Sequence, residues 1–233
     1  TLRRSSAASD VYKRQGGLAL GASSAYAGDA LTVVSWGGAY TKSQIEAYHK
    51  PYTAKYGTKI QSEDYNGGLA EIRAQVEAGK ITWDVVDLEV SDAARGCDDG
   101  LFEKISAGSL PNGVNGALPS KDFIPGALQE CAVGTIVWST IYAYDADKYK
   151  SKKPTTISDF FDVKKFPGKR GMRKVPKVNL EWALMADGVD GKDVYKVLAT
   201  KAGQDRAFNK LDTRKNDVLW WEAGAQPPQM LAD

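Results

Sequence analysis

The chain has 233 residues, of which 42% are hydrophobic and 26% charged, and its formal net charge is +2 at pH 7. Residues 1–15 contribute four basic side chains and one acidic side chain, so the rest of the chain has a net charge of −1. This near-neutral balance argues against a nucleic-acid-binding protein, which needs a concentrated basic face. The sequence also lacks the run of about 20 apolar residues that is typical of a membrane-spanning helix.

The start of the chain does not look like part of a folded domain. Residues 5–15, SSAASDVYKRQ, match codon for codon a transposon adapter of sequencing libraries read in frame, and the alternative is a genuine basic leader. We therefore leave residues 1–15 out of the fold interpretation. Residues 16–27 are uncharged and end in Ala25-Tyr26-Ala27, a small-x-small pattern typical of signal peptide cleavage. We expect a signal peptide remnant here and a periplasmic protein, with a loose Gly/Ala linker as the alternative.

From residue 31 onward, short apolar runs alternate with amphipathic helices. We predict strands over residues 31–36, 59–65 and 83–88, and helices over 40–56, 68–78 and 91–97. In the first helix, Ile45, Tyr48 and Tyr52 recur at helical spacing, and Ser91-Asp92 is expected to cap the third helix. This β-α-β-α-β-α order predicts an α/β fold with a doubly wound, mainly parallel sheet.

The second half of the chain is expected to form a second lobe. Residues 100–126 are irregular, and the apolar run 132–145 predicts a strand that passes from the first lobe to the second. Beyond it we predict helices over 157–162, 179–186, 193–201 and 204–211, and strands over 171–174 and 218–221. The lobes would span residues 28–138, without a return segment, and 139–233. The closing residues PPQMLAD look like the interior of a helix, so we expect a chain truncated at its C-terminus and an incomplete second lobe.

The residues that usually carry catalysis or bind metals are scarce. The two cysteines, Cys97 and Cys131, favour a disulfide in an exported protein, with two buried thiols as the alternative. The one histidine, His49, is expected to be a solvated helix residue, and it lacks partners for a catalytic triad or a zinc site. Walker, GxGxxG, HExxH and GxSxG motifs do not occur. The sequence therefore predicts a protein that is not an enzyme and that holds no cofactor or metal.

Several segments together resemble a known family. They keep their order and spacing over residues 31–233, and they read SWGGAY, EAYHKPYTAKYGTKI, WDVVDLEVSDA, VGTIVWSTIYAYD and TTISDFFDVKKFPGKRG. The set resembles the polyamine-type (spermidine/putrescine) periplasmic substrate-binding proteins of ABC transporters, within the extracellular solute-binding protein family. The resemblance implies a type II periplasmic binding fold, in which each of two lobes is a mainly parallel sheet flanked by helices. It also implies a monomer whose lobes close on a ligand before the protein docks on a membrane permease.

The resemblance also implies where the ligand binds. In open α/β sheets, ligands bind beyond the carboxyl ends of the strands. The candidate residues at such positions are Trp36, Gly37, Gly38, Glu89, Ser91, Asp92, Trp138, Thr140, Arg173, Trp221 and Glu222. Glu89 would suit a cationic amine, and the face of Trp138 would attract one. Structural roles remain the alternative for each, namely turns for the glycines, a helix cap for Ser91 or Asp92 and core packing for the tryptophans.

The charge of the ligand is the open question. The family places carboxylates where this chain has Arg173, Lys174 and Lys177. An inward-facing Arg173 would repel a polyamine and attract a carboxylate, although a solvated surface run is the alternative. The leading hypothesis is therefore a periplasmic receptor that delivers a polyamine or related amine to an ABC importer. The alternative is an anionic or zwitterionic organic solute on the same fold, and a more remote one is an α/β hydrolase or transferase.

Overall fold

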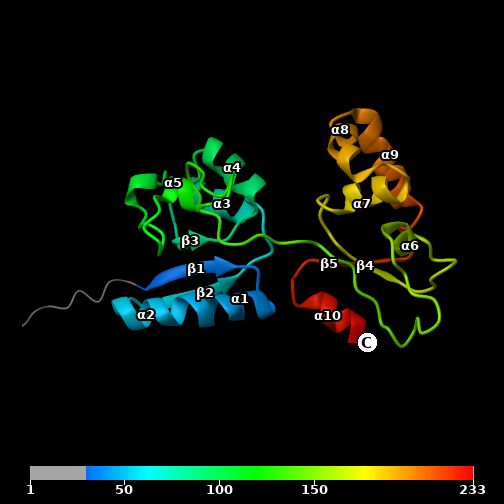
Figure 1. The fold of residues 1–233 in the computed structure, drawn as a ribbon, viewed down its shortest axis with the longest axis horizontal. Helices are drawn as coiled ribbons and strands as arrows, with labels where there is room; N and C mark the ends of the chain where they lie inside the picture. Colours follow the sequence, from blue (N-terminus) through cyan, green and yellow to red (C-terminus); the bar gives the residue numbers. More distant parts are fainter. Residues whose placement is uncertain (1–29, 233) are drawn as a thin grey trace, which may run out of the picture.

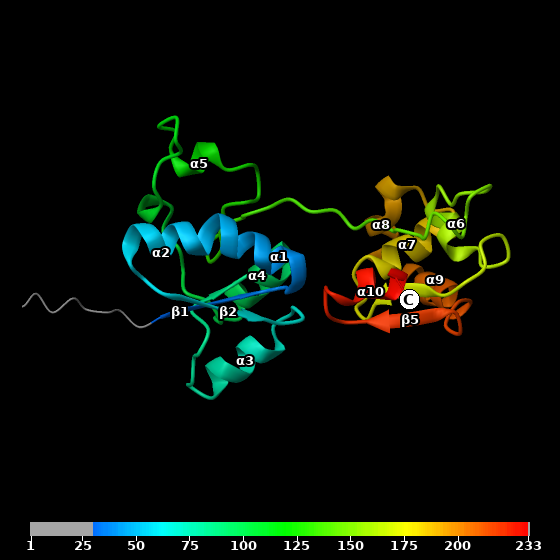
Figure 2. The same ribbon diagram turned by 90° about the horizontal axis from the view of Figure 1, so that it is seen from below.

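The computed structural model describes residues 30–232, which form two α/β units (Figure 1). The N-terminal unit comprises residues 30–134, since residues 132–134 pair with residues 127–129, and the C-terminal unit comprises residues 142–232. An extended segment, drawn in green, crosses from one to the other in both views (Figure 2). The predicted boundary at residue 138 falls within this crossing and stays a prediction. The predicted adapter and signal segments lie outside the described residues.

The N-terminal unit is built on a parallel sheet. Its strands are β1 (Leu31–Ser35), β2 (Ile60–Asp64) and β3 (Val85–Val86), in the order β2-β1-β3. Leu31 lies opposite Ile60, and Val33 lies opposite Val85. Helices cover both faces, since α1 and α2 lie on one side of the sheet and α3 on the other (Figures 1 and 2). The predicted parallel α/β fold is confirmed, although β3 is shorter than predicted.

The first helix was predicted correctly in place, but its buried face is not the one that α-helical spacing favours. It runs through α1 (Gly38–Gln44), a π-helical turn η1 (Ile45–His49) and α2 (Lys50–Tyr56). Tyr48 and Tyr52, which recur at α-helical spacing, are 51% and 42% exposed, whereas Gln44 and His49 are buried. The wider π turn explains this rotation, because it brings residues five apart onto the same face. His49 therefore takes the inward position that α-helical spacing assigns to Tyr48.

The two helices that follow are α3 (Ala70–Glu77) and α4 (Val90–Asp98). The predicted cap of α4 was wrong by two residues. Glu89 is the N-cap residue, with an extended backbone and no side-chain capping bond, and Ser91 and Asp92 lie inside the first turn. This placement leaves the side chain of Glu89 available for contacts outside its own helix.

The disulfide between Cys97 and Cys131 is present, as the sequence favoured. It joins the last turn of α4 to the end of an irregular stretch that contains only η2 (Ala107–Ser109) and α5 (Pro119–Asp122). The strand predicted over 132–145 is wrong, because this stretch makes only an isolated bridge between Leu128 and Val133. A strand needs a neighbour to complete its hydrogen bonds, and no described strand runs beside this apolar segment.

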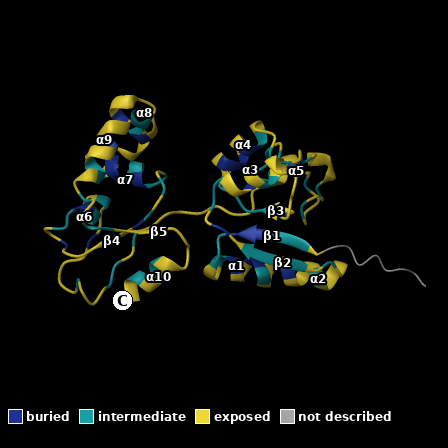
Figure 3. Cartoon of the chain, turned by 180° about the vertical axis from the view of Figure 1, so that it is seen from behind, coloured by how far each residue is buried: buried dark blue, intermediate teal, exposed yellow. Residues whose placement is uncertain are grey.

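The C-terminal unit has a second parallel sheet and its own core. Strands β4 (Arg170–Arg173) and β5 (Val218–Trp221) pair so that Arg173 lies opposite Trp221. The helices are α6 (Ile157–Phe161), α7 (Asn179–Ala186), η3 (Gly191–Asp193), α8 (Val194–Leu198), α9 (Lys201–Asp212) and α10 (Gln226–Ala232). Phe161, Met172, Ala183, Leu184, Val194 and Ala207 form the buried cluster. Buried residues, dark blue in Figure 3, lie on the inward sides of α7 and α9.

Candidate functional site

Polar and aromatic residues follow each strand of the N-terminal sheet where that strand ends. Trp36 follows β1, Tyr65 follows β2 and Asp87 follows β3, and Glu89 starts the helix after it. The end of β4 in the C-terminal unit contributes Arg173, which contacts Trp36, Glu89 and the backbone of Asn66. The carboxyl ends of the two parallel sheets therefore meet, and ligands of open α/β sheets bind at such ends.

Arg173 lies at the centre of this junction. The carbon of its guanidinium group is 5.0 Å from the ring centroid of Trp36 and 6.0 Å from that of Trp221. One nitrogen donates to the backbone oxygen of Asn66 at 2.7 Å, and another lies 3.4 Å from a carboxylate oxygen of Glu89. The side chain is 22% exposed. Cation–π contacts with one tryptophan from each unit thus hold a partly buried, charged arginine in place.

A second cation, Lys177, makes closer ion pairs with Glu89 and with the neighbouring Asp92. These two carboxylates are called the acidic group below. Its ammonium lies 2.5 Å from Glu89 and 2.8 Å from Asp92, whose side chains are 13% and 7% exposed. The other oxygen of Asp92 accepts from Arg95 at 2.8 Å. Burial alone would lower the pKa of Lys177, but hydrogen bonds to Asp92 and Glu89 outweigh burial and raise it. The lysine is therefore charged at neutral pH.

Residues that the sequence analysis missed position Trp36. Tyr65 is buried, its ring centroid is 5.5 Å from those of Trp36 and Trp83, and its hydroxyl donates to the backbone oxygen of Asp87 at 2.6 Å. Gly67 has φ +86°, and a β-carbon there would lie 2.3 Å from the Trp36 ring. Only glycine fits both the left-handed backbone and this close approach. The glycine pair Gly67-Gly68, separated by two residues from the end of β2, was the signal available in the sequence.

Asp87 is a further missed residue. One of its carboxylate oxygens accepts hydrogen bonds from Tyr40 at 2.8 Å, Gln44 at 2.8 Å and Ser35 at 3.2 Å. Burial, followed by the hydrogen bond to Asp87, raises the pKa of the Tyr40 hydroxyl well above its ordinary value. Three neutral donors therefore hold this acidic side chain, and α1 is tied to the end of β3.

The structure gathers only part of the predicted site. Trp36, Glu89, Asp92, Arg173 and Trp221 come together, as described above. Gly37 lies beside the carboxylate of Asp64, and Gly38 faces the backbone of Ala225. The remaining candidates lie outside this group: Ser91 and Thr140 are exposed, Trp138 is 53% exposed, and Glu222 pairs with Lys174 at 3.2 Å.

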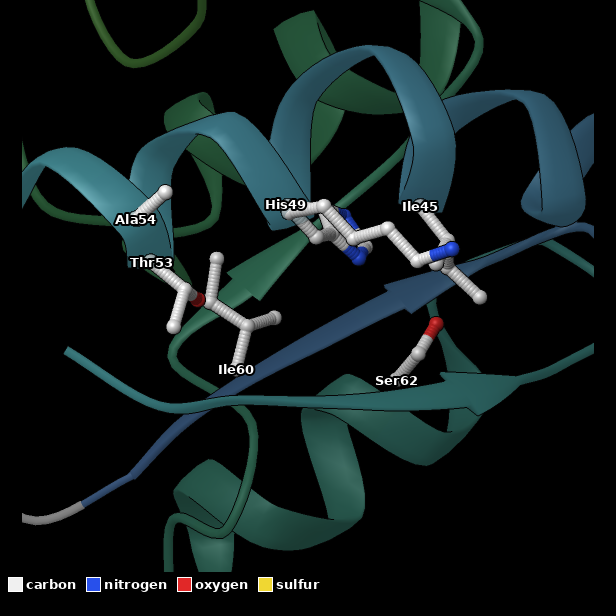
Figure 4. Close-up of a pocket in the computed structure, with 7 residues that line it drawn as sticks. Ile45, His49, Thr53, Ala54, Ile60 and Ser62 are labelled. Carbon is white, nitrogen blue, oxygen red and sulfur yellow. The ribbon is translucent and has the colours of Figure 1, made fainter. Parts of the chain in front are cut away.

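A separate hollow of about 370 Å³ lies between the first helix and β2 (Figure 4), and none of the charged residues described above lines it. It is lined by Ile45, His49, Lys50, Thr53, Ala54, Ile60 and Ser62. The prediction that His49 is solvated is wrong, because only 9% of the residue is exposed. The π turn places its ring against the sheet, and burial lowers its pKa below the ordinary value of 6.5.

This burial predicts a pH-dependent stability. Folded His49 resists protonation, so the unfolded chain binds more protons as pH falls below about 6.5 and the free energy of unfolding decreases. We expect a loss over this window with a slope of at most about 1.4 kcal/mol per pH unit, the limit for one proton. Urea denaturation between pH 7 and pH 5 measures it. Since His49 is the one histidine in the sequence, His49→Gln should flatten the curve, and an unchanged slope in that variant would contradict the assignment.

Two parallel α/β units that meet at the ends of their strands, around charged and aromatic side chains, define a two-lobed solute-binding protein. Residues 47–233 match the family model described as bacterial extracellular solute-binding protein, and the chain belongs to this family. The expected membership of the extracellular solute-binding protein family is thus confirmed. Among residues 30–232, no helix is both long and apolar enough to cross a membrane.

Individual relatives have narrower names. The chain is 47% identical over 216 residues to the gamma-aminobutyric acid-binding protein of Pseudomonas aeruginosa, which covers 93% of this chain and 59% of the relative. It resembles the binding protein MotA of A. tumefaciens B6 in complex with glucopine, with a TM-score of 0.78, 32% identity, and 86% and 60% of the two chains covered. It also resembles the Atu4243-GABA receptor, with a TM-score of 0.70, 33% identity, and 88% and 59% covered.

These names refine the expectations from the sequence. The family and these relatives are named for binding, in agreement with the prediction that the chain is not an enzyme. Two of the three relatives are named for gamma-aminobutyric acid and the third is in complex with glucopine, so they do not support the polyamine type. The chain spans about three-fifths of the length of each of the three, and the activity of the whole protein is therefore treated as a proposal.

Proposed function

We propose that the chain is the solute-binding receptor of an ABC importer and captures a small zwitterion with one ammonium and one carboxylate. An ω-amino acid such as gamma-aminobutyric acid is the ligand we favour. The observation that carries the proposal is the position of Arg173, between Trp36 and Trp221 and opposite Glu89. The names of two relatives point to the same class of ligand.

The ion pair between Arg173 and Glu89 is long enough for a zwitterionic ligand to replace it. Its 3.4 Å separation is longer than the 2.5 Å and 2.8 Å contacts of Lys177. A zwitterion inserted here would replace one loose ion pair with two, its carboxylate on the guanidinium fork of Arg173 and its ammonium on Glu89. Trp36 and Trp221 would cover the ligand's methylene groups and keep water from both pairs.

Other charge types fit less well. A polyamine has no carboxylate for Arg173 and would bring additional ammonium groups close to Lys177. A dicarboxylate would satisfy Arg173 but would meet the carboxylates of Glu89 and Asp92, which are 13% and 7% exposed. Like charges at close range disfavour binding. The site contains both cations and carboxylates, and it therefore favours a ligand with one charge of each sign.

The remaining parts of the function are proposed on the family description. An extracellular solute-binding protein acts outside the cytoplasmic membrane, so we place this one in the periplasm. The two units would close on the solute by a hinge motion, and the closed monomer would dock on a membrane permease. The extended crossing between residues 134 and 142 connects the two units and is where such a hinge would bend.

A ligand panel tests the proposal on the natural protein. We expect gamma-aminobutyric acid to raise the melting temperature, with about 2.7 kcal/mol of stabilisation at 100 times its Kd. Butylamine, which lacks the carboxylate, and 4-acetamidobutyrate, which lacks the ammonium, should each give little shift. Calorimetric titration then gives the affinity. A shift with putrescine alone, or with succinate alone, would overturn the zwitterion assignment.

A further inference from the structure

Lys177 contacts the acidic group of the other unit so closely that the carboxylates are already partly neutralised. Its ammonium contacts Glu89 and Asp92, which are 88 and 85 residues away in sequence. The ammonium uses one oxygen of Glu89 and one of Asp92, and Arg95 uses the second oxygen of Asp92. Only the Glu89 oxygen facing Arg173, at 3.4 Å, is left with a long contact.

The backbone around Lys177 is built to hold this position. Val178, the next residue, has φ +70° and ψ −42°, a region that β-branched residues rarely occupy. The side chain of Asn179 donates to the backbone oxygens of Arg173 at 2.6 Å and Val175 at 2.7 Å. The strained residue and the two hydrogen bonds fix the turn between β4 and α7, so the chain presents Arg173 and Lys177 together.

We propose that Lys177 determines ligand specificity by occupying, with its own ammonium, the place that a second ligand ammonium would take. The inference rests on the proposed function and deepens it: the acidic group can accept one more ammonium, at Glu89, and no more. Diamines and longer polyamines are excluded because both oxygens of Asp92 and one oxygen of Glu89 are already paired, which leaves no carboxylate for a second ligand ammonium. The carboxyl end of a zwitterion meets no such barrier, since Arg173 lies beside the free position.

The test removes the internal ammonium and measures diamine binding. We expect Lys177→Met to bind putrescine at least about tenfold more tightly than the unsubstituted protein, because two carboxylates lose their cation. Lys177→Arg keeps the positive charge, so its affinity for putrescine should not increase. Lys174→Met is the matched control, since Lys174 lies three residues away, is 66% exposed and pairs with Glu222 instead. Titration calorimetry of each variant against putrescine gives the comparison.

Two further measurements keep the test decisive. In Lys177→Met/Asp92→Asn, the gain for putrescine should be smaller than in Lys177→Met, because only Glu89 of the two carboxylates that Lys177 pairs with remains. If Lys177→Met does not fold by thermal melting, Lys177→Gln replaces it, with the same expectation. Unchanged putrescine affinity in the folded variant would overturn the inference. Failure of the unsubstituted protein to bind gamma-aminobutyric acid would count against the proposed function alone, because the diamine comparison does not depend on that ligand.

Discussion

Arg173→Ala is expected to weaken the binding of gamma-aminobutyric acid by about a hundredfold or more. Truncating one partner of a buried, hydrogen-bonded charge pair typically costs about 2–5 kcal/mol of binding free energy. Here the loss would leave the ligand carboxylate without a cation and would remove the cation–π contacts to Trp36 and Trp221. Isothermal titration of the variant, checked for folding by its melting curve, measures the effect.

Two substitutions separate this role from a general loss of charge. Arg173→Lys keeps the charge but not the planar fork, and it should recover only part of the affinity. Lys174→Ala removes the adjacent cation, which is exposed and pairs with Glu222, and it should leave binding within about threefold of the original, as expected of a surface ion pair. An Arg173→Ala protein that binds as tightly as the Lys174→Ala protein would show that the carboxylate does not bind at Arg173.

The fold could be predicted wherever local signals suffice. Helix α7 has the same bounds, 179–186, in the prediction and the structure, and β5 has the same bounds, 218–221. The face of the first helix could not be predicted, because a π turn at Ile45–His49 breaks the α-helical spacing that the prediction assumed. The strand predicted over 132–145 failed for a different reason. Apolar composition favours a strand, but only a hydrogen-bonding neighbour makes one.

The candidate site was predicted from one rule, namely that ligands bind at the carboxyl ends of parallel strands. Residues that this rule does not cover were missed. The ends of parallel strands pointed to Trp36 and Glu89, because the fold brings such ends to one edge. Nothing local indicated that Lys177 would reach Glu89 across 88 residues, since that pairing depends on how the two units meet. Tyr65 and Gly67 were missed because an aromatic residue and a glycine after a strand usually have structural roles. Tyr65 and Gly67 do have a structural role here, and that role is to position the side chain of Trp36.

Loss of the disulfide is expected to be the largest single effect on stability. Cys97 and Cys131 are 34 residues apart, and in the chain-entropy model closing such a loop stabilises the fold by roughly 3–4 kcal/mol. The enclosed segment has only two short helices, η2 and α5, so little else restrains it. We expect Cys97→Ala/Cys131→Ala to lose that amount in urea denaturation, with a fall of roughly 6–16 °C in melting temperature for a chain of this size.

The same change should affect binding far less. A disulfide acts mainly on the unfolded chain, and Glu89 and Asp92 are held at the first turn of α4, at the opposite end from Cys97. At a temperature where the variant is folded, the Kd for gamma-aminobutyric acid should therefore stay within about threefold, since native contacts at the site are unchanged. Adding reductant to the unsubstituted protein should reproduce the drop in melting temperature and should leave the double variant unaffected. If the double variant had the same melting temperature as the unsubstituted protein, packing of α4 alone would hold this region together.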